Sequence, residues 1–403
     1  GGLAGIGGVV NVLLVGEEQG AIDDDGDENG LSSQDTQNVL GNVATATDAG
    51  YFTPNASLTA EENAALFSSG PTNVMGALTD TRDAATTARI TGSVVTSSSV
   101  DVSGTDRTAT DAQLGAISGG AGALSALVGY TRINGSVSAT VDGAITASDI
   151  SVNALSEDLG GTNLFNEPLI AARVRGGVGA AGIMSNISIG TSVNASAGGT
   201  LAGDGYGELV VQAADTTTAL ADANGAAAGG IGVGIAAAIA GRNGSVSASL
   251  DDGSLATRFD GITVDAANAG TLRASSIALS GGILGAGSGS IALANDATGV
   301  SAVIGSGVLT STGDGGLSLT AASTTDTSAS AKGAAVSGQV AIGASAAEAT
   351  TSVNVMARDN GRLHRTSGDL VIGASLDGAG TSADAAAASG GVLAGAQASV
   401  ALA

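Results

Sequence analysis

The stretch GGIGVGIAAAIA, residues 229–240, decides the fold of this chain. Large and small residues alternate in it, with Ile231, Val233, Ile235 and Ile239 at odd positions and Gly232, Gly234, Ala236 and Ala238 at even positions. A period of two is typical of a β-strand, in which successive side chains point to opposite faces. The stretch therefore predicts a strand with one branched aliphatic face and one face that is almost bare backbone.

Two strand patterns recur along the chain with a period of about 53 residues. In both patterns aliphatic residues alternate with Ser, Thr, Asn or Asp, so one face is expected to be buried and the other solvated. The first pattern begins at Val137, Val193, Val246, Val300 and Val353, and the second begins at Ile150, Leu209, Ile262, Leu317 and Leu370. Short strands repeated at a fixed period predict an all-β solenoid of parallel, stacked strands. Each repeat has room for two coils of about 26 residues or three of about 18.

The composition predicts a thin core. The chain has 403 residues but only 4 Phe, 3 Tyr and no Trp, and aromatic side chains normally supply much of the volume of a core. A face without side chains lets another backbone approach closely. We therefore expect a packing surface on the Gly/Ala face, either between laterally packed rods or between two walls of one flattened solenoid. Its residues are Gly230, Gly232, Gly234, Ala236 and Ala238.

The charge of the chain excludes some partners. The formal net charge is −24, from 13 basic and 37 acidic side chains, whereas nucleic-acid binding depends on neutralising phosphates with Lys and Arg. An anionic membrane surface is disfavoured for the same reason. Residues 224–241 carry no charge, but their many glycines and period of two argue against insertion into a membrane. The chain has no cysteine, which excludes disulfides and thiolate zinc sites.

The repeat divides the chain into three parts. Residues 1–15 form the start of the solenoid, residues 16–87 form an insertion, and residues 88–403 carry the repeats. The insertion is expected to be partly helical because a capping box at Thr59 and Glu62 precedes an apolar run. The repeat pattern continues to both ends of the sequence, which predicts end-to-end stacking of copies or of flanking segments.

The most specific candidate for a metal site lies in the insertion. Asp23, Asp25, Asp27 and Asn29 precede Gly30 in the pattern of a calcium loop, in which alternate oxygens converge on the ion and glycine permits a tight turn. The bidentate Glu of such a loop is missing. Two interpretations therefore stand, a calcium site and a solvated acidic turn.

The sequence does not predict a catalytic site. His364 is the only histidine, and its flanks, Arg362 and Arg365, are basic, so it is expected to lie at the surface rather than in a Ser-His-Asp system. Adjacent carboxylates such as Asp251 and Asp252 point apart along a chain, which does not suit the paired acids of a glycosidase. We therefore expect no enzymatic activity. The alternative is a solenoid enzyme that acts on polysaccharides.

The repeats resemble those of giant bacterial surface adhesins, the filamentous-haemagglutinin-like exoproteins and leukotoxin-like filamentous adhesins. The residues that carry the resemblance are Thr216–Ala221, Gly229–Gly234, Asn243–Ala248, Asp252–Ser254 and Gly261–Ala266. The resemblance implies a right-handed parallel β-helix, export from a Gram-negative cell to its surface or the extracellular space, and a role in attachment, biofilm or filament formation. The implied partners are further copies of the chain and host or neighbouring cell-surface glycans. A ligand-binding adhesin whose specificity lies in residues 16–87 is a further interpretation.

Overall fold

The computed structural model describes residues 4–15, 84–108, 110, 115–119, 122–157, 170–377, 380–392 and 394–403. Every element in these ranges is a β-strand, and every strand pair is parallel, which confirms the predicted all-β class. The predicted helices and calcium loop fall on residues 16–83, outside the described residues. The strands are β1 (Ala4–Val15), β2 (Ala84–Arg107), β3 (Gly115–Gly119), β4 (Gly122–Glu157), β5 (Ile170–Ala202), β6 (Glu208–Arg242), β7 (Ser245–Leu250), β8 (Leu255–Asp296), β9 (Gly299–Ile304), β10 (Leu309–Ser337), β11 (Val340–Thr351), β12 (Asn354–Asp359), β13 (Leu363–Thr366), β14 (Leu370–Leu376), β15 (Gly380–Gly390) and β16 (Ala394–Leu402).

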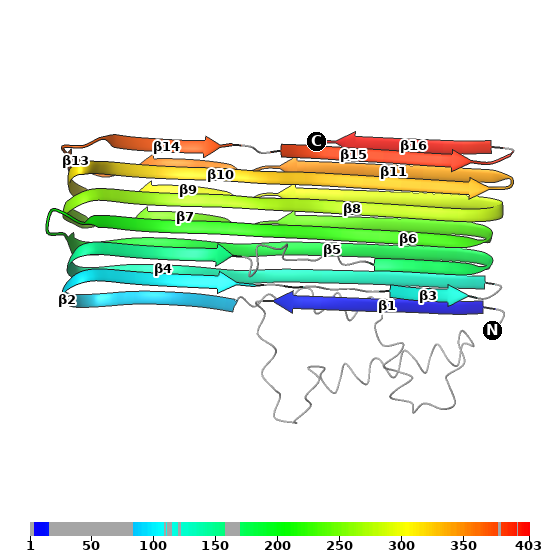
Figure 1. The fold of residues 1–403 in the computed structure, drawn as a ribbon, viewed down its shortest axis with the longest axis horizontal. Coiled ribbons are helices and arrows are strands. Elements are labelled where there is room, and N and C mark those ends of the chain that lie inside the picture. The colour runs from blue at the N-terminus through cyan, green and yellow to red at the C-terminus, as the bar shows by residue number, and fades with distance from the viewer. Residues whose placement is uncertain are drawn as a thin grey trace, which may run out of the picture.

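One repeat makes one complete coil, and the coils stack into a flattened slab (Figure 1). In the coil that contains β6, residues 209–229 form an outgoing wall, residues 231–250 run back as a return wall, and residues 255–259 close the wide end as a short side. The next coil begins at Ile262, which pairs with Leu209. One repeat of about 53 residues therefore forms two long walls and one short side. The predicted division of each repeat into two or three small coils is wrong.

The strand registers follow the repeat in the sequence. Ile150, Leu209, Ile262, Leu317 and Leu370 pair in succession, and so do Val137, Val193, Val246 and Val300. One predicted step is wrong, because Val300 pairs with Val355 and not with Val353. A shift of two residues leaves the side chain on the same face of the strand. Alternation alone therefore did not distinguish these two valines, and both pack against the core.

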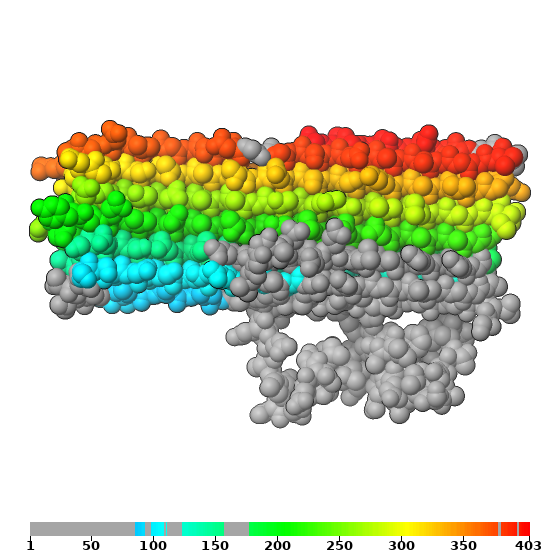
Figure 2. Space-filling model, in the orientation of Figure 1, coloured from blue at the N-terminus to red at the C-terminus, as the bar shows by residue number. Residues whose placement is uncertain are grey.

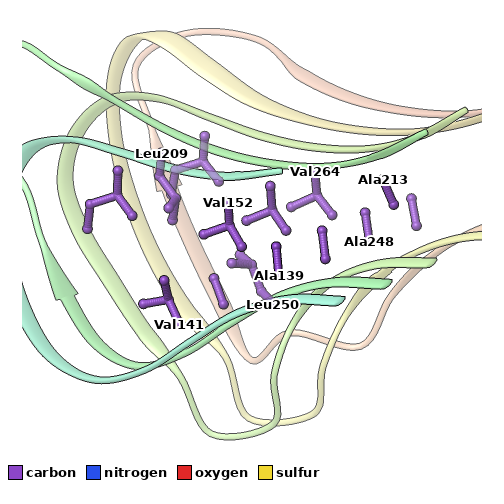
Figure 3. Packing of buried hydrophobic residues seen from close by; sticks show 14 of the residues in the cluster. Ala139, Val141, Val152, Leu209, Ala213, Ala248, Leu250 and Val264 are labelled. Carbon is purple, nitrogen blue, oxygen red and sulfur yellow. The ribbon is translucent and has the colours of Figure 1, made fainter. Parts of the chain in front are cut away.

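The core narrows from the wide end to the opposite edge. Large side chains such as Phe259, Ile262 and Leu250 fill the wide end, where Figure 3 shows residues of both walls pointing toward one another. Farther along, most of the buried hydrophobic residues are alanines, with Leu and Ile chiefly in β4 and β5, and the last cluster before the narrow edge is Ala286, Ala335 and Ala341. The taper brings the two walls together, and the sequence matches it with progressively smaller side chains.

The Gly/Ala face of β6 lies inside this taper. Gly232, Gly234, Ala236 and Ala238 are buried. A Cβ atom added to Gly234 would lie 2.5 Å from the carbonyl oxygen of Leu279 on the opposing wall. The sequence allowed two contacts for the Gly/Ala face, one between laterally packed rods and one between the two walls of a single solenoid. The structure places these residues in the second contact, between the walls of one slab. Gly230 lies at the narrow bend, where an added Cβ would lie 2.7 Å from the carbonyl oxygen of Gly177.

A strip of polar side chains crosses the alanine part of the core. Arg242 of the return wall is fully buried and forms an ion pair of 2.5 Å with Asp215 of the outgoing wall. Arg242 also donates to Asn268 of the next coil, and Asp215 accepts a 2.6 Å hydrogen bond from Thr217. Polar groups removed from water need such partners, so this strip ties the two walls together at one register.

Candidate functional site

The two walls present different outer surfaces. The outer face of the outgoing wall carries polar side chains that bond from coil to coil: Asp265 of β8 accepts hydrogen bonds from Gln212 of β6 at 3.3 Å and from Thr320 of β10 at 2.6 Å. The wide half of the return wall is also polar, with Ser247 of β7 and Ser301 of β9 3.2 Å apart. Figure 2 shows the coils as successive parallel bands. These hydroxyl and amide ladders cover the slab without many charges.

The narrow half of the return wall is apolar on its outer surface. Ile231, Val233 and Ile235 are 42%, 38% and 52% exposed, because their small neighbours occupy the inner face. We call this surface the apolar face; its outward residues with described side chains are Leu124, Ala126, Val128, Val178, Ala180, Gly182, Met184, Ile231, Val233, Ile235, Ala237, Gly285, Gly287, Gly289, Ile291, Val340, Ile342, Ala344, Ala346, Ala396, Ala398 and Val400. None of them carries a charge or a hydrogen-bonding side chain. A large exposed apolar patch on a soluble protein usually marks a contact surface.

The apolar face has a defined relief. The outward positions of β8 are Gly285, Gly287 and Gly289, so this strand forms a shallow groove. The branched side chains of β6 border one side of it: a Cβ on Gly285 would meet Cγ2 of Ile231 at 3.9 Å, and one on Gly287 would meet Cγ2 of Val233 at 4.0 Å. Val340 and Ile342 of β11 border the other side. The face therefore consists of two aliphatic ridges with a glycine groove between them.

The narrow edge of the slab continues this apolar character. Ile283 and Leu284 are 73% and 54% exposed, and Val336 and Val392 are 64% and 83% exposed. In β8 the edge is widened by a bulge, because Gly282 pairs with Gly229 and Gly285 pairs with Ile231, which leaves Ile283 and Leu284 without counterparts in β6. The apolar surface thus extends from the return wall around the narrow edge.

The C-terminal coil leaves the core open. Leu370 and Ile372 are 51% and 48% exposed, whereas their partners one coil below, Leu317 and Leu319, are 1% and 0% exposed. Figure 1 shows β14, β15 and β16 along this upper border of the stack. Among the described residues, no strand pairs with the upper side of this border, and unpaired strand edges are templates for another strand.

His364 lies in a hydrogen-bonded array that the sequence did not reveal. Its Nδ1 is 2.7 Å from Oγ1 of Thr310, and its Nε2 is 2.9 Å from a carboxylate oxygen of Asp359. The side chain of His364 is 15% exposed, so it lies partly at the surface and partly covered by its hydrogen-bond partners. The repeat could have revealed part of this array, because His364 occupies the same position in its coil as Thr310 in the coil below, and the two residues pair.

This array contains the groups of a hydroxyl–imidazole–carboxylate system, but its hydroxyl is not accessible. Thr310 is 4% exposed and belongs to the same inward column as Ala256. A nucleophile must reach the substrate atom that it attacks. The array therefore joins β10, β12 and β13 across the wide end of the last coils, rather than presenting a reactive group.

Acidic side chains gather in the turns at the wide end. Burial raises the pKa of Asp251, and the charges of Asp142 and Asp252 add to this effect against a hydrogen bond from Ser249. By contrast, hydrogen bonds from the Ser148 hydroxyl and the Tyr206 backbone N–H lower the pKa of Asp204. Within the described ranges, no group of three or more His, Cys, Asp or Glu side chains is placed to hold a metal ion. Asp23, Asp25, Asp27 and Asn29 lie outside these ranges.

No helix among the described residues is long and apolar enough to cross a membrane. No family model, no curated protein and no solved structure matches this chain.

Proposed function

We propose that this chain is a structural segment of an extracellular or cell-surface fibre, built as a right-handed parallel β-helix, that serves attachment, biofilm or filament formation. The right-handed form is supported by the general preference of parallel strands for right-handed connections. The repeat architecture supports a rigid rod, since each coil contacts only its neighbours and the slab lengthens by one coil per repeat.

The repeated inner columns carry the proposal, because Ile150, Leu209, Ile262, Leu317 and Leu370 pair in succession from coil to coil. Leu370 and Ile372 continue a column whose lower members are fully buried, and they are themselves 51% and 48% exposed. Burying such side chains stabilises by about 25 cal/mol per Å² of apolar surface. A further coil, from another copy or from flanking residues of a longer chain, covers this surface and pairs the free backbone groups of the border.

The role is mechanical rather than catalytic. Hydroxyl and amide ladders make the polar surfaces, and the hydroxyl–imidazole–carboxylate array has its hydroxyl in the core. The proposed attachment partners are host or neighbouring cell-surface glycans, which binding of the purified chain to a glycan array would identify.

Electron microscopy of the purified chain tests the assembly. We expect filaments of uniform width that lengthen along the stacking direction of the coils. The variant Ile372→Lys places a charge on the inner face of the border strand and is expected to stop elongation. Val371→Lys is the matched control, because the adjacent residue pairs with Ser318 on the outer face and is also exposed. Isolated particles of single-chain size for the unaltered protein at every concentration would refute the proposal.

A further inference from the structure

We infer that the apolar face is a contact between two copies of this chain, which pack their return walls face to face. The inference rests on the proposed function, since it adds lateral pairing of rods to their end-to-end growth. It assigns lateral packing to the surface that carries Ile231, Val233 and Ile235, opposite to the Gly/Ala residues that lie inside the slab.

Charge restricts contact between two copies to a surface such as the apolar face. Two chains of net charge −24 repel one another, so they associate where a surface carries no charge. The outward residues of the apolar face are all aliphatic, methionine or glycine, whereas the outer face of the outgoing wall carries Asp265, Asp326 and Arg273. The same acidic charge opposes binding to an anionic membrane.

The relief of the face is self-complementary. The glycine groove of β8 lies between the ridges of β6 and β11, each one strand spacing away, at about 4.8 Å. When two copies are related by a two-fold axis, the Ile231–Val233–Ile235 ridge of each copy sits over the groove of the other. Contacts of this kind are isologous, because the same patch is used twice. Packed sheets are about 10 Å apart, a distance at which such side chains interdigitate.

The area of the face is sufficient for a weak dimer. The six strands β4, β5, β6, β8, β11 and β16 span about 24 Å across the face, and seven residues along each strand span about 23 Å. One copy therefore contributes about 550 Å², and a pair buries about 1,100 Å², just above the roughly 1,000 Å² expected of a biological interface. Repetition of the contact along two rods strengthens it by multivalency.

Sedimentation of the Ile372→Lys variant tests the contact, because that substitution removes end-to-end growth. We expect a concentration-dependent dimer in the micromolar range. Adding Ile235→Glu and Ile342→Glu is expected to weaken the dimer at least 100-fold. The matched control adds Thr218→Glu and Thr324→Glu, the same charge on outward positions of the outgoing wall, and is expected to leave the dimer intact.

Three results would overturn the inference. One is a monomer at all concentrations. Another is a dimer that the Glu substitutions on the apolar face do not weaken. The third is binding to phosphatidylcholine vesicles, abolished by those substitutions, in place of dimerisation. Failure of the fibre proposal is a separate result, since a chain that dimerises through the apolar face but never forms filaments retains the lateral contact.

Discussion

Replacing Gly234 by alanine tests the close approach of the two walls. The new Cβ would lie 2.5 Å from the carbonyl oxygen of Leu279, whereas real Cβ atoms keep at least 3.0 Å from other heavy atoms. The walls must therefore separate locally by about 0.5 Å, a gap that forfeits about a quarter of the dispersion energy of the neighbouring contacts. Overpacking of this kind costs about 1–3 kcal/mol, and the lower entropy of the unfolded chain returns about 0.4–1 kcal/mol. A net loss of about 1–2 kcal/mol is expected.

Gly299→Ala is the matched control for Gly234→Ala. Gly299 also lies in a strand of the return wall, it pairs with Ser245 on the outer face, and no atom lies within 4 Å of an added Cβ. This variant is expected to be unchanged or stabilised by up to about 1 kcal/mol. Urea unfolding followed by circular dichroism measures both, at concentrations that exclude association. Equal unfolding midpoints for the two variants would refute the tightly apposed walls.

Three further predictions concern charge and strain. Replacing Arg242 alone by Met leaves Asp215 buried without its partner and is expected to lower the unfolding free energy by about 3–5 kcal/mol. The double variant with Arg242→Met and Asp215→Leu is expected to recover most of this loss. Urea unfolding measures both variants, and equal losses of stability in the single and double variants would contradict the buried pair. Burial raises the pKa of Asp251 in the folded state, so ionisation of this carboxyl at neutral pH destabilises the fold. Asp251→Asn is therefore expected to stabilise the protein at pH 7, and this gain is expected to vanish below the ordinary pKa of 3.8. Urea unfolding at pH 7 and pH 3 tests this, and a gain of the same size at both pH values would contradict it. Arg258 has a positive φ of 63°, so Arg258→Gly is expected to stabilise by about 0.5 kcal/mol, the relief of left-handed strain less the entropy of glycine; a lower melting temperature would contradict this.

Periodicity predicted the strands and most registers because each coil repeats the same inward residues. The column from Ile150 to Leu370 is an example, and its members pair in succession. The number of coils per repeat was not predictable in this way. It depends on the length of the walls, and strand alternation is the same in a long wall as in a short one. The position of Val355 over Val300 was missed for a related reason, since a shift of two residues preserves the face.

The functional surfaces were harder to predict. When the sequence of one strand is considered alone, its large aliphatic residues are expected to face the core. In β6, however, Ile231, Val233 and Ile235 face outward. The reason is the taper of the slab, which at the level of Gly232 and Gly234 in β6 brings the opposing backbone so close that no larger side chain fits between the walls. That constraint arises from the opposing wall, about 45 residues farther along the chain at Leu279, and a local pattern does not contain it. The array of His364 with Thr310 was missed because it joins different coils.

Disulfide formation between engineered cysteines tests the stacked register most directly, since the chain contains no cysteine of its own. Ser247 pairs with Ser301, and Ser301 pairs with Met356, on the outer face of three successive coils. Neighbouring positions are about 4.8 Å apart, within the usual Cα range of a disulfide, whereas positions two coils apart are separated by about 9.6 Å. Cysteine pairs at 247 and 301, and at 301 and 356, are expected to form intramolecular disulfides under mild oxidation, and a pair at 247 and 356 is expected to remain reduced. Efficient bonding of the 247 and 356 pair, with none for the two adjacent pairs, would contradict the parallel stack.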